Sequence, residues 1–368
     1  MPTSATGTID PAAPSYATPV AVSYWQVVRR LGKLYWQLKK QEDYFKQHLQ
    51  NLLPAAARQH QASFTPQQIK RFVKYWQLAH NVVCDNLSQL TGRALTPEEE
   101  RRIGLLSVFA PLFDDLLDND ILQQHEILQL IEAPDQYVPQ QAADEIVLAI
   151  YRELLQEVPN RALFTQHLQT VTRWQHESQK QRDRFIQEEE LYQITYNKSY
   201  YGILLFCAAL NHYPSPALET MLYPIAGLMQ LTNDAFDVWK DIHKDVYTLP
   251  NLHRNFGQLQ HQFMAEISSI NRQLDHLPYP AAAKANFSIT IHALHAMGWM
   301  SLQQLRTVTA GITSIDGLKS LTRAQLVCDL DSLPQKFRWF KLVHYFANFH
   351  SSLAAKPFQG QPTEQTPQ

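Results

Sequence analysis

Cysteine and glycine are both scarce in this chain of 368 residues. Its three cysteines, Cys84, Cys207 and Cys328, are far apart and form no CxxC pair, which argues against a disulfide framework and against a zinc site. Only 11 glycines are present, and repeated short runs of Val, Ile and Thr, the pattern of β-strands, are missing. These absences point away from small disulfide-linked folds and from folds built on a sheet.

Charge of one sign and long apolar runs are also missing. The 32 basic residues nearly balance the 34 acidic ones, so composition gives no indication of a nucleic-acid-binding surface. No run of eighteen apolar residues occurs, and we expect no stable insertion into a membrane. The first twenty residues lack the basic and apolar regions of a signal peptide, and we therefore expect an intracellular, cytoplasmic protein.

Long segments with helical periodicity take the place of strands. Thr65 and Thr96 are each followed by proline, and Glu99 can complete a capping box with Thr96, so two helices begin at these positions. About ten segments carry a helical apolar pattern: 24–49, 65–90, 96–120, 139–157, 160–183, 187–211, 215–243, 255–275, 280–308 and 335–352. The pattern predicts an all-α protein.

The organisation of the chain is simple. No internal repeat of fixed period and no linker interrupts the helical segments, which predicts one α-helical domain over residues 22–352. We expect residues 1–21 to be a disordered lead and residues 353–368 a disordered tail, because both are polar and rich in proline.

A first acidic cluster lies in the stretch "FAPLFDDLLDND". Asp114, Asp115 and Asp118 are spaced three and four residues apart, so their carboxylates can converge on one helical face, where like charges repel. A solvated surface turn is the alternative. The apolar neighbours argue against it, since they leave little room for an exposed helix: Leu112, Phe113, Leu116 and Leu117.

A second cluster lies in "QLTNDAFDVWKDIHKDVYTLP". Asn233, Asp237 and Asp241 follow an i, i+4, i+8 pattern that stacks three oxygen ligands along one side of a helix. Oxygen ligands suit Mg²⁺, which binds through carboxylates and substrate phosphates. A solvated charged face is again the alternative, but two such clusters on two apolar helices predict several Mg²⁺ ions held around a diphosphate.

These clusters resemble the motifs of the class I isoprenoid synthases, the all-α superfamily of terpene cyclases, trans-prenyltransferases and squalene/phytoene synthases. Asp114, Asp115 and Asp118 are similar to the DDxxD motif of that fold. The stretch from Asn233 to Asp241 resembles the second motif of terpene cyclases, N-D-x-x-S/T/G-x-x-x-E, with Asp at the last two ligand positions.

The second motif is also similar to those of the other branches. With "YTLP" after it, the stretch resembles the second motif of squalene/phytoene synthases. Asp234 and Asp237 resemble the second aspartate motif of prenyltransferases, with the leading Asp changed to Asn233. The resemblance implies a single-domain helical bundle with a central active-site cavity, three Mg²⁺ ions that Mn²⁺ can replace, a linear prenyl diphosphate as substrate, and a homodimer.

Several basic side chains could contact a diphosphate. Lys198 stands 35 residues before Asn233, where a prenyltransferase has its K-T/S-x-x-L lysine, and Arg338 with Tyr345 resembles the late Arg-Tyr pair of terpene cyclases. The candidates for catalysis are Lys198, Arg182 and Tyr345. The candidates for binding the diphosphate are Lys198, Arg184, Lys244 and Arg338. For all of them except Lys198, a solvated surface charge is the stronger alternative.

The implied chemistry also needs an apolar cavity wall. Loss of diphosphate leaves an allylic carbocation, which aromatic faces stabilise and which must be kept from water. The candidate wall residues are Phe113, Tyr200, Phe236 and Trp299. Ordinary core packing is the alternative for each of them.

The branch is chosen from what the chain does not contain. Chain-elongating prenyltransferases have an Arg-Arg-Gly after the first aspartate motif, whereas no basic residue follows Asp118 here until Arg152 except histidine. One diphosphate pocket is thus better supported than two. We expect a terpene synthase that ionises a prenyl diphosphate, with a head-to-tail or head-to-head prenyltransferase and a non-catalytic helical scaffold as alternatives.

Overall fold

The chain is described here from a computed structural model, over residues 19–59, 64–119 and 121–350. The structure is 77% helix, and no strand occurs in these residues, so the predicted all-α class is confirmed. The tail expected at 353–368 and all but 19–21 of the expected lead lie outside the described residues.

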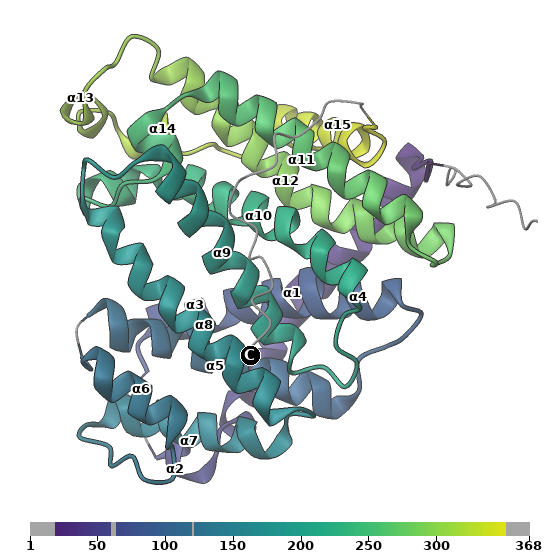
Figure 1. The fold of residues 1–368 in the computed structure, drawn as a ribbon. Coiled ribbons are helices and arrows are strands. Elements are labelled where there is room, and N and C mark those ends of the chain that lie inside the picture. Colours follow the sequence, from purple (N-terminus) through teal and green to yellow (C-terminus); the bar gives the residue numbers. More distant parts are fainter. Residues whose placement is uncertain (1–18, 60–63, 120, 351–368) are drawn as a thin grey trace, which may run out of the picture.

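The helices divide into two groups joined by two long helices. The first group, apart from the beginning of α1, packs at one end of the bundle (Figure 1) and consists of α1 (Tyr24–Leu52), α2 (Ala55–Arg58), α3 (Pro66–Leu78), α4 (Asp85–Leu90), α5 (Pro97–Asp118), α6 (Gln124–Glu132) and α7 (Ala142–Glu157). The connecting helices are α8 (Arg161–Glu177) and α9 (Glu188–Cys207). The second group consists of α10 (Pro216–His243), α11 (Phe256–His276), α12 (Ala281–Val308), α13 (Ile315–Lys319), α14 (Arg323–Leu326) and α15 (Leu333–Ala347).

The predicted helix starts are confirmed by their caps. Thr65 and Thr96 each accept a hydrogen bond from the third backbone N–H of the helix, and Gln68 and Glu99 bond back to the cap residue. Proline occupies the first position in both helices, where its missing N–H costs nothing. Local chemistry thus decides where α3 and α5 begin.

The structure differs from the expected helices in several places. The segment 65–90 is broken by a π-helical turn at Ala79–Cys84, which separates α3 from α4. Four short helices, α2, α6, α13 and α14, have no counterpart among the expected segments, and α6 is capped by Gln123 rather than by Ser or Thr. The last helix begins earlier than expected and ends at Ala347, because the side chain of Asn348 bonds to the backbone of Val22.

One connected hydrophobic core includes buried residues from Val22 to Ala347. A close approach within it joins α9 to α10, where a methyl group added at Gly227 would overlap the ring of Tyr196. A second close approach joins α10 to α12, where Gly298 faces Thr232. The core is continuous across the expected domain of 22–352, whose limits stay a prediction.

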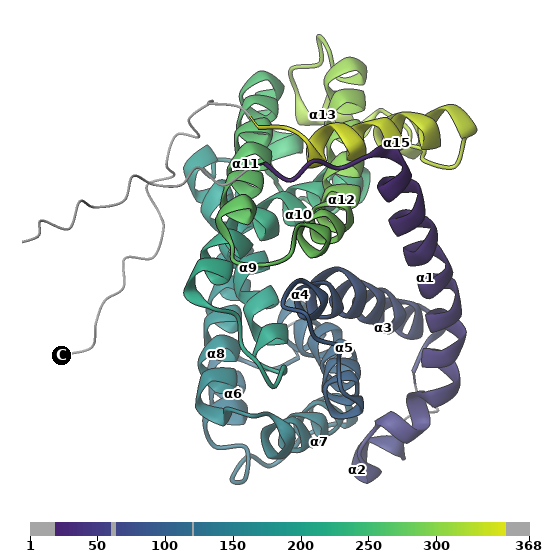
Figure 2. The same ribbon diagram turned by 90° about the vertical axis from the view of Figure 1, so that its right-hand side faces the viewer.

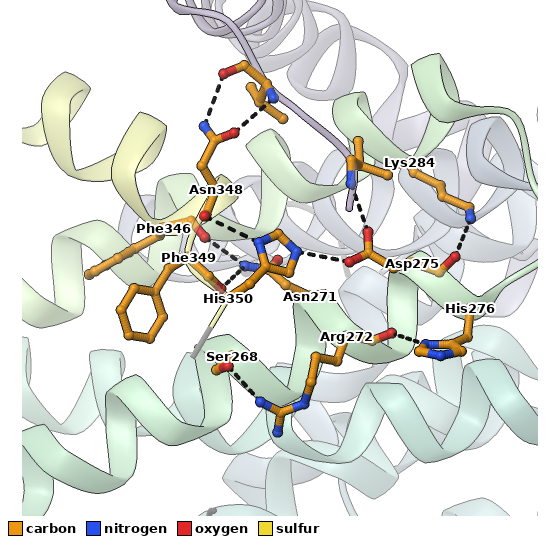
Figure 3. A network of polar contacts seen from close by, with 12 residues as sticks. Ser268, Asn271, Arg272, Asp275, His276, Lys284, Phe346, Asn348, Phe349 and His350 are labelled. Atoms are coloured by element: carbon orange, nitrogen blue, oxygen red, sulfur yellow. Dashed lines mark hydrogen bonds and ion pairs between the residues drawn. The ribbon is translucent and has the colours of Figure 1, made fainter. Parts of the chain in front are cut away.

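Both ends of the described chain are tied to α11 and α15 (Figure 3). The Asn348 side chain accepts from Val22 N and donates to Val22 O, both at 2.9 Å. Asp275 accepts from the backbone N–H of Val20 at 3.0 Å and pairs with His350 at 2.8 Å. These contacts fix the start of α1 against the end of α15.

The long helices are not membrane spans. No helix in the described ranges is long and apolar enough to cross a bilayer. The three cysteines are free, and all of them are buried.

Candidate functional site

The first acidic cluster forms the last turn of α5. Asp114 and Asp115 are half-buried and Asp118 is exposed, while the preceding turns of the helix are almost entirely buried. This end of the helix contains no basic residue. Carboxylates are unfavourable at a helix C-terminus, because the helix dipole is negative there, so the cluster requires cations from outside the helix.

One of those cations is Arg71 on α3. Its Nη1 lies 2.7 Å and 2.8 Å from the two carboxylate oxygens of Asp115. Its Nη2 donates to the carbonyl of Pro111 at 3.1 Å. Asp115 is therefore engaged in joining α3 to α5, and the sequence analysis did not identify this partner.

The other two aspartates have neutral partners. The hydroxyl of Tyr75, one turn after Arg71, donates to Asp114 at 3.1 Å, and the Gln175 amide of α8 donates to Asp118 at 2.8 Å. Oε1 of Gln175 is buried and has no hydrogen-bond partner among the described residues. No sequence pattern marks Tyr75 or Gln175, because both reach the cluster only through the packing of separate helices.

The second cluster lies near the C-terminal end of α10. Asp237 and Asp241 are half-buried, and Asp237 pairs with Lys240 at 3.0 Å. Asn233, expected to be the first ligand, is exposed. Its role as a metal ligand stays a prediction.

The neighbouring residue Asp234 is the buried acid of this cluster. It accepts hydrogen bonds from Gln230 at 2.8 Å and from Thr195 of α9 at 3.4 Å. Burial raises its pKa to about 6, and the charge of Asp237 adds to that rise. The sequence analysis noted Asp234 only for its likeness to the prenyltransferase motif, and the side that it faces could not be read from spacing alone.

Lys198 on α9 connects the two clusters electrostatically. Burial raises the pKa of Asp114, and the positive charge of Lys198 is the largest influence that opposes this rise. The same lysine charge lowers the pKa of Asp234 against the effect of burial. The charge of Lys198 therefore acts on one carboxylate of each motif, Asp114 and Asp234, which are 120 residues apart in sequence.

Asp241 lies near two other carboxylates of the second cluster. Burial raises its pKa to about 7, and the carboxylates of Asp234 and Asp237 raise it further, while Lys240 and Lys244 oppose the shift. Burial disfavours the charged form of this carboxylate and the neighbouring negative charges add to that effect, so a bound cation would favour the charged form again.

The residues present fit magnesium by their chemistry, although not as a ready-made cage. Among the described residues, no three acidic, histidine or cysteine side chains converge closely enough to hold an ion by themselves. Mg²⁺ needs only one or two carboxylates, since water and substrate phosphates complete its coordination. The unpartnered Oε1 of Gln175 beside Asp118 is an acceptor that a metal-bound water would satisfy.

Of the other candidate basic residues on this side of the chain, only some are connected with the acidic clusters. Lys244 acts on Asp241 and so belongs to the second cluster. Arg182 and Arg184 are exposed, and Arg184 stacks over its neighbour Phe185 at 5.2 Å. The segment before Arg182 is tied to the end of the second motif, because Gln181 exchanges hydrogen bonds with the Tyr247 backbone at 2.7 Å and 3.2 Å.

Arg338 and Trp299 line a different hollow. This hollow, of about 660 Å³, is open to solvent and is formed by α11, α12 and α15, and its lining contains none of the six predicted metal ligands. Arg338 donates to Gln303 at 2.6 Å there. Tyr345 is exposed and packs its ring on Phe346 and Phe349.

The four candidate wall aromatics lie in separate parts of the core. Phe113 stacks on Phe109. Tyr200 packs on Tyr201 and Tyr223, and Trp299 on Phe263 and Phe346. Phe236 is half-buried on α10, next to the second cluster. Of these side chains, Phe113 and Phe236 are the two that directly adjoin the acidic residues in sequence.

Comparison with known proteins adds no family to this picture. No family model matches the chain, and no curated protein matches it either. The function therefore has to be argued from the two clusters and from Lys198.

Proposed function

We propose that the protein is a Mg²⁺-dependent isoprenoid synthase that ionises a linear prenyl diphosphate and releases a terpene hydrocarbon or alcohol. The substrate's diphosphate would bind between the last turn of α5 and the end of α10. The proposal extends the resemblance of both motifs to the class I synthases, and it includes the homodimer as a further expectation.

One observation carries the proposal. Lys198 acts electrostatically on Asp114 of the first motif and on Asp234 of the second, which supports a diphosphate site bounded by both motifs. A scaffold gains nothing from placing like charges this way, because each buried carboxylate costs free energy unless a cation compensates it. In a site that binds a polyanion together with metal ions, the bound metal ions neutralise these carboxylates, so the arrangement lowers the free energy of ligand binding.

Different side chains would bind the diphosphate and position the metal ligands. Lys198 would bind the diphosphate as a compact positive charge, and Lys244 would extend that contact at the end of α10. Arg71 would hold Asp115 and thereby position Asp114 and Asp118 beside it. Tyr75 would orient Asp114 by its hydroxyl, and Gln175 would orient Asp118.

Bound magnesium would neutralise the diphosphate as the carbon–oxygen bond breaks. The bond's electron pair leaves with the diphosphate, and the organic fragment becomes an allylic cation. Phe113 and Phe236 would face that cation and exclude water until it loses a proton or captures one water molecule.

A second candidate is a head-to-head condensation of two prenyl diphosphates. The "YTLP" stretch, Tyr247 to Pro250, favours it, because this part of the squalene/phytoene-like motif is buried and bonded to Gln181. A surface loop would have no need of such anchoring. Both candidates begin with the same ionisation and differ only in what captures the cation.

The test is incubation of the purified protein and Mg²⁺ with prenyl diphosphates of increasing length, each with and without isopentenyl diphosphate. Products are identified by gas chromatography with mass spectrometry. A hydrocarbon or alcohol formed without isopentenyl diphosphate supports the terpene synthase. A head-to-head dimer supports the second candidate, and longer diphosphates formed only with the co-substrate indicate head-to-tail elongation.

Matched variants distinguish loss of the active site from loss of folding. Asp114→Asn and Asp241→Asn should abolish product formation, whereas Asp135→Asn, at an exposed aspartate before α7, should leave it unchanged. Circular dichroism verifies that each variant keeps its helices. Full turnover in both site variants would refute the assignment of the two clusters.

A further inference from the structure

Most of the exposed large apolar side chains lie on two helices. Thirteen large hydrophobic side chains are exposed in the described part of the chain, and six of them belong to α1 and three to α15. They include two tryptophans, Trp25 at 71% and Trp36 at 60% exposure. Such a concentration of exposed aromatic surface indicates a contact surface, because single exposed apolar residues are normally scattered.

On α1 the exposed apolar residues other than Tyr44 form one stripe. Trp25 and Trp36 are separated by three helical turns and so lie on the same side, with Val28, Gly32 and Lys39 between and beyond them. The opposite face packs on the core, with Val27 and Leu31 buried. The stripe is therefore a second apolar face of a helix whose first apolar face is already covered.

The N-terminal part of α1 and the whole of α15 carry charge of one sign, and the two acidic residues of α1, Glu42 and Asp43, follow further along that helix. Residues 24–40 contain five basic residues and no acidic one, and α15 contains three basic residues and no acidic one. The exposed members are Arg29, Lys33, Lys39, Lys40, Lys336, Arg338 and Lys341. Lys39 lies over the Trp36 ring at 5.7 Å and Lys341 over the Phe337 ring at 4.5 Å, so basic and aromatic groups are interleaved.

The two helices are held together where they meet. The rings of Tyr24 and His344 stack at 3.7 Å. The Asn348 side chain makes two hydrogen bonds with the Val22 backbone (Figure 3), and α15 lies across the beginning of α1 at the outer edge of the bundle (Figure 2). The interleaved groups of α1 and α15 thus belong to one continuous outer region, called here the α1/α15 surface.

We propose that the α1/α15 surface docks on a lipid bilayer that contains anionic headgroups. Tryptophan and tyrosine rings settle at the level of the headgroups, and basic side chains extend to the phosphates. The contact lies in the interface, since no helix of the described residues can span the membrane. A second copy of the chain fits this surface less well than an anionic bilayer does, because a symmetric dimer would bring two basic faces together.

This inference does not depend on the proposed function, as it rests on exposure and charge alone. The test is co-sedimentation of the full chain with vesicles of phosphatidylcholine, and with vesicles of phosphatidylcholine and phosphatidylserine mixed one to one. Binding is expected to the mixed vesicles only, and added salt should weaken it by screening the charges. Tryptophan emission should shift to shorter wavelength on binding.

Two variants and two controls locate the contact. Trp25→Ala combined with Trp36→Ala removes the rings, and Lys39→Glu combined with Lys40→Glu reverses two charges; each pair should weaken binding at least roughly tenfold. The controls are Phe185→Ala, an aromatic residue that is 72% exposed elsewhere, and Arg161→Glu at the start of α8. Neither control should change binding.

Three results would overturn the proposal. The first is absence of binding to the mixed vesicles by the folded wild-type chain. The second is equal binding to both kinds of vesicle, unaffected by the charge reversal. The third is a dimer in solution that the tryptophan variant dissociates, which would assign the α1/α15 surface to a second copy of the chain.

Discussion

Arg71 places one guanidinium nitrogen 2.7 Å and 2.8 Å from the two carboxylate oxygens of Asp115. This pair joins α3 to the last turn of α5, so the middle aspartate of the first motif has a structural partner. Its neighbours Asp114 and Asp118 accept hydrogen bonds from neutral donors, Tyr75 and Gln175. The three aspartates of one motif should therefore respond differently to substitution.

The first prediction concerns the stability contributed by this pair. Arg71→Met should lower the free energy of unfolding by about 1 kcal/mol, because the pair is only partly exposed and both oxygens are bound. Urea unfolding measures the change. Lys180→Met, which breaks the exposed pair with Glu177, is the control and should change stability much less. Equal losses in the two variants would show that Arg71 is an ordinary surface charge.

The second prediction concerns Lys198. Lys198→Met should weaken the binding of Mg²⁺ with inorganic pyrophosphate by roughly tenfold to a hundredfold, the effect of losing a hydrogen bond to a charged group. Thermal shift against pyrophosphate concentration measures the affinity. Lys198→Arg should recover part of it by restoring the charge, and Lys46→Met on α1 should leave it unchanged. Unaltered affinity in the methionine variant would remove Lys198 from the site.

The third prediction concerns pH. The pKa of Asp234 is raised to about 6 and that of Asp241 to about 7, both above their ordinary value of 3.8, so in the absence of metal the folded chain binds more protons there than the unfolded chain. The stability that these two groups contribute is then complete below pH 4 and is lost as the pH rises to 7.

Comparison of variants isolates this contribution. Relative to wild type, Asp241→Asn should gain stability as the pH of a metal-free solution rises from about 4 to 7, because the amide cannot lose a proton. Urea unfolding at several pH values measures the difference between the two chains. Added Mg²⁺ should stabilise the wild type more at pH 8 than at pH 5, since protons and metal compete for the carboxylates. A difference between wild type and variant that does not depend on pH would contradict the raised pKa.

The fourth prediction concerns the packing of α9 on α10. Gly227→Ala should destabilise the chain by about 1–3 kcal/mol, because the new methyl group would overlap the Tyr196 ring. Gly202→Ala is the matched control: nothing lies within 4 Å of a methyl group there, and alanine favours a helix interior by up to about 1 kcal/mol. Thermal unfolding of the two variants measures both effects. A neutral Gly227→Ala would mean that the two helices can separate without cost.

The helices and the two acidic clusters are determined by the sequence itself, because their causes are local. Thr65 and Thr96 cap helices through residues only three positions away, and the spacing of the apolar side chains defines which face is buried. The same locality places Asp114 with Asp118, and Asp237 with Asp241, on the turns of single helices. The expected segments lack the short helices α2, α6, α13 and α14, and in α6 the glutamine cap is not a strong start signal.

Only the tertiary structure decided which groups surround the carboxylates. Arg71 and Asp115 are 44 residues apart, and their pairing depends on how α3 lies against α5. The rotation of α10 against α9 decides that Asp234 is buried while Asn233 is exposed. The effect of Lys198 on both motifs depends on the packing of three helices. Such contacts are set by the packing of whole helices, which no short stretch of sequence specifies.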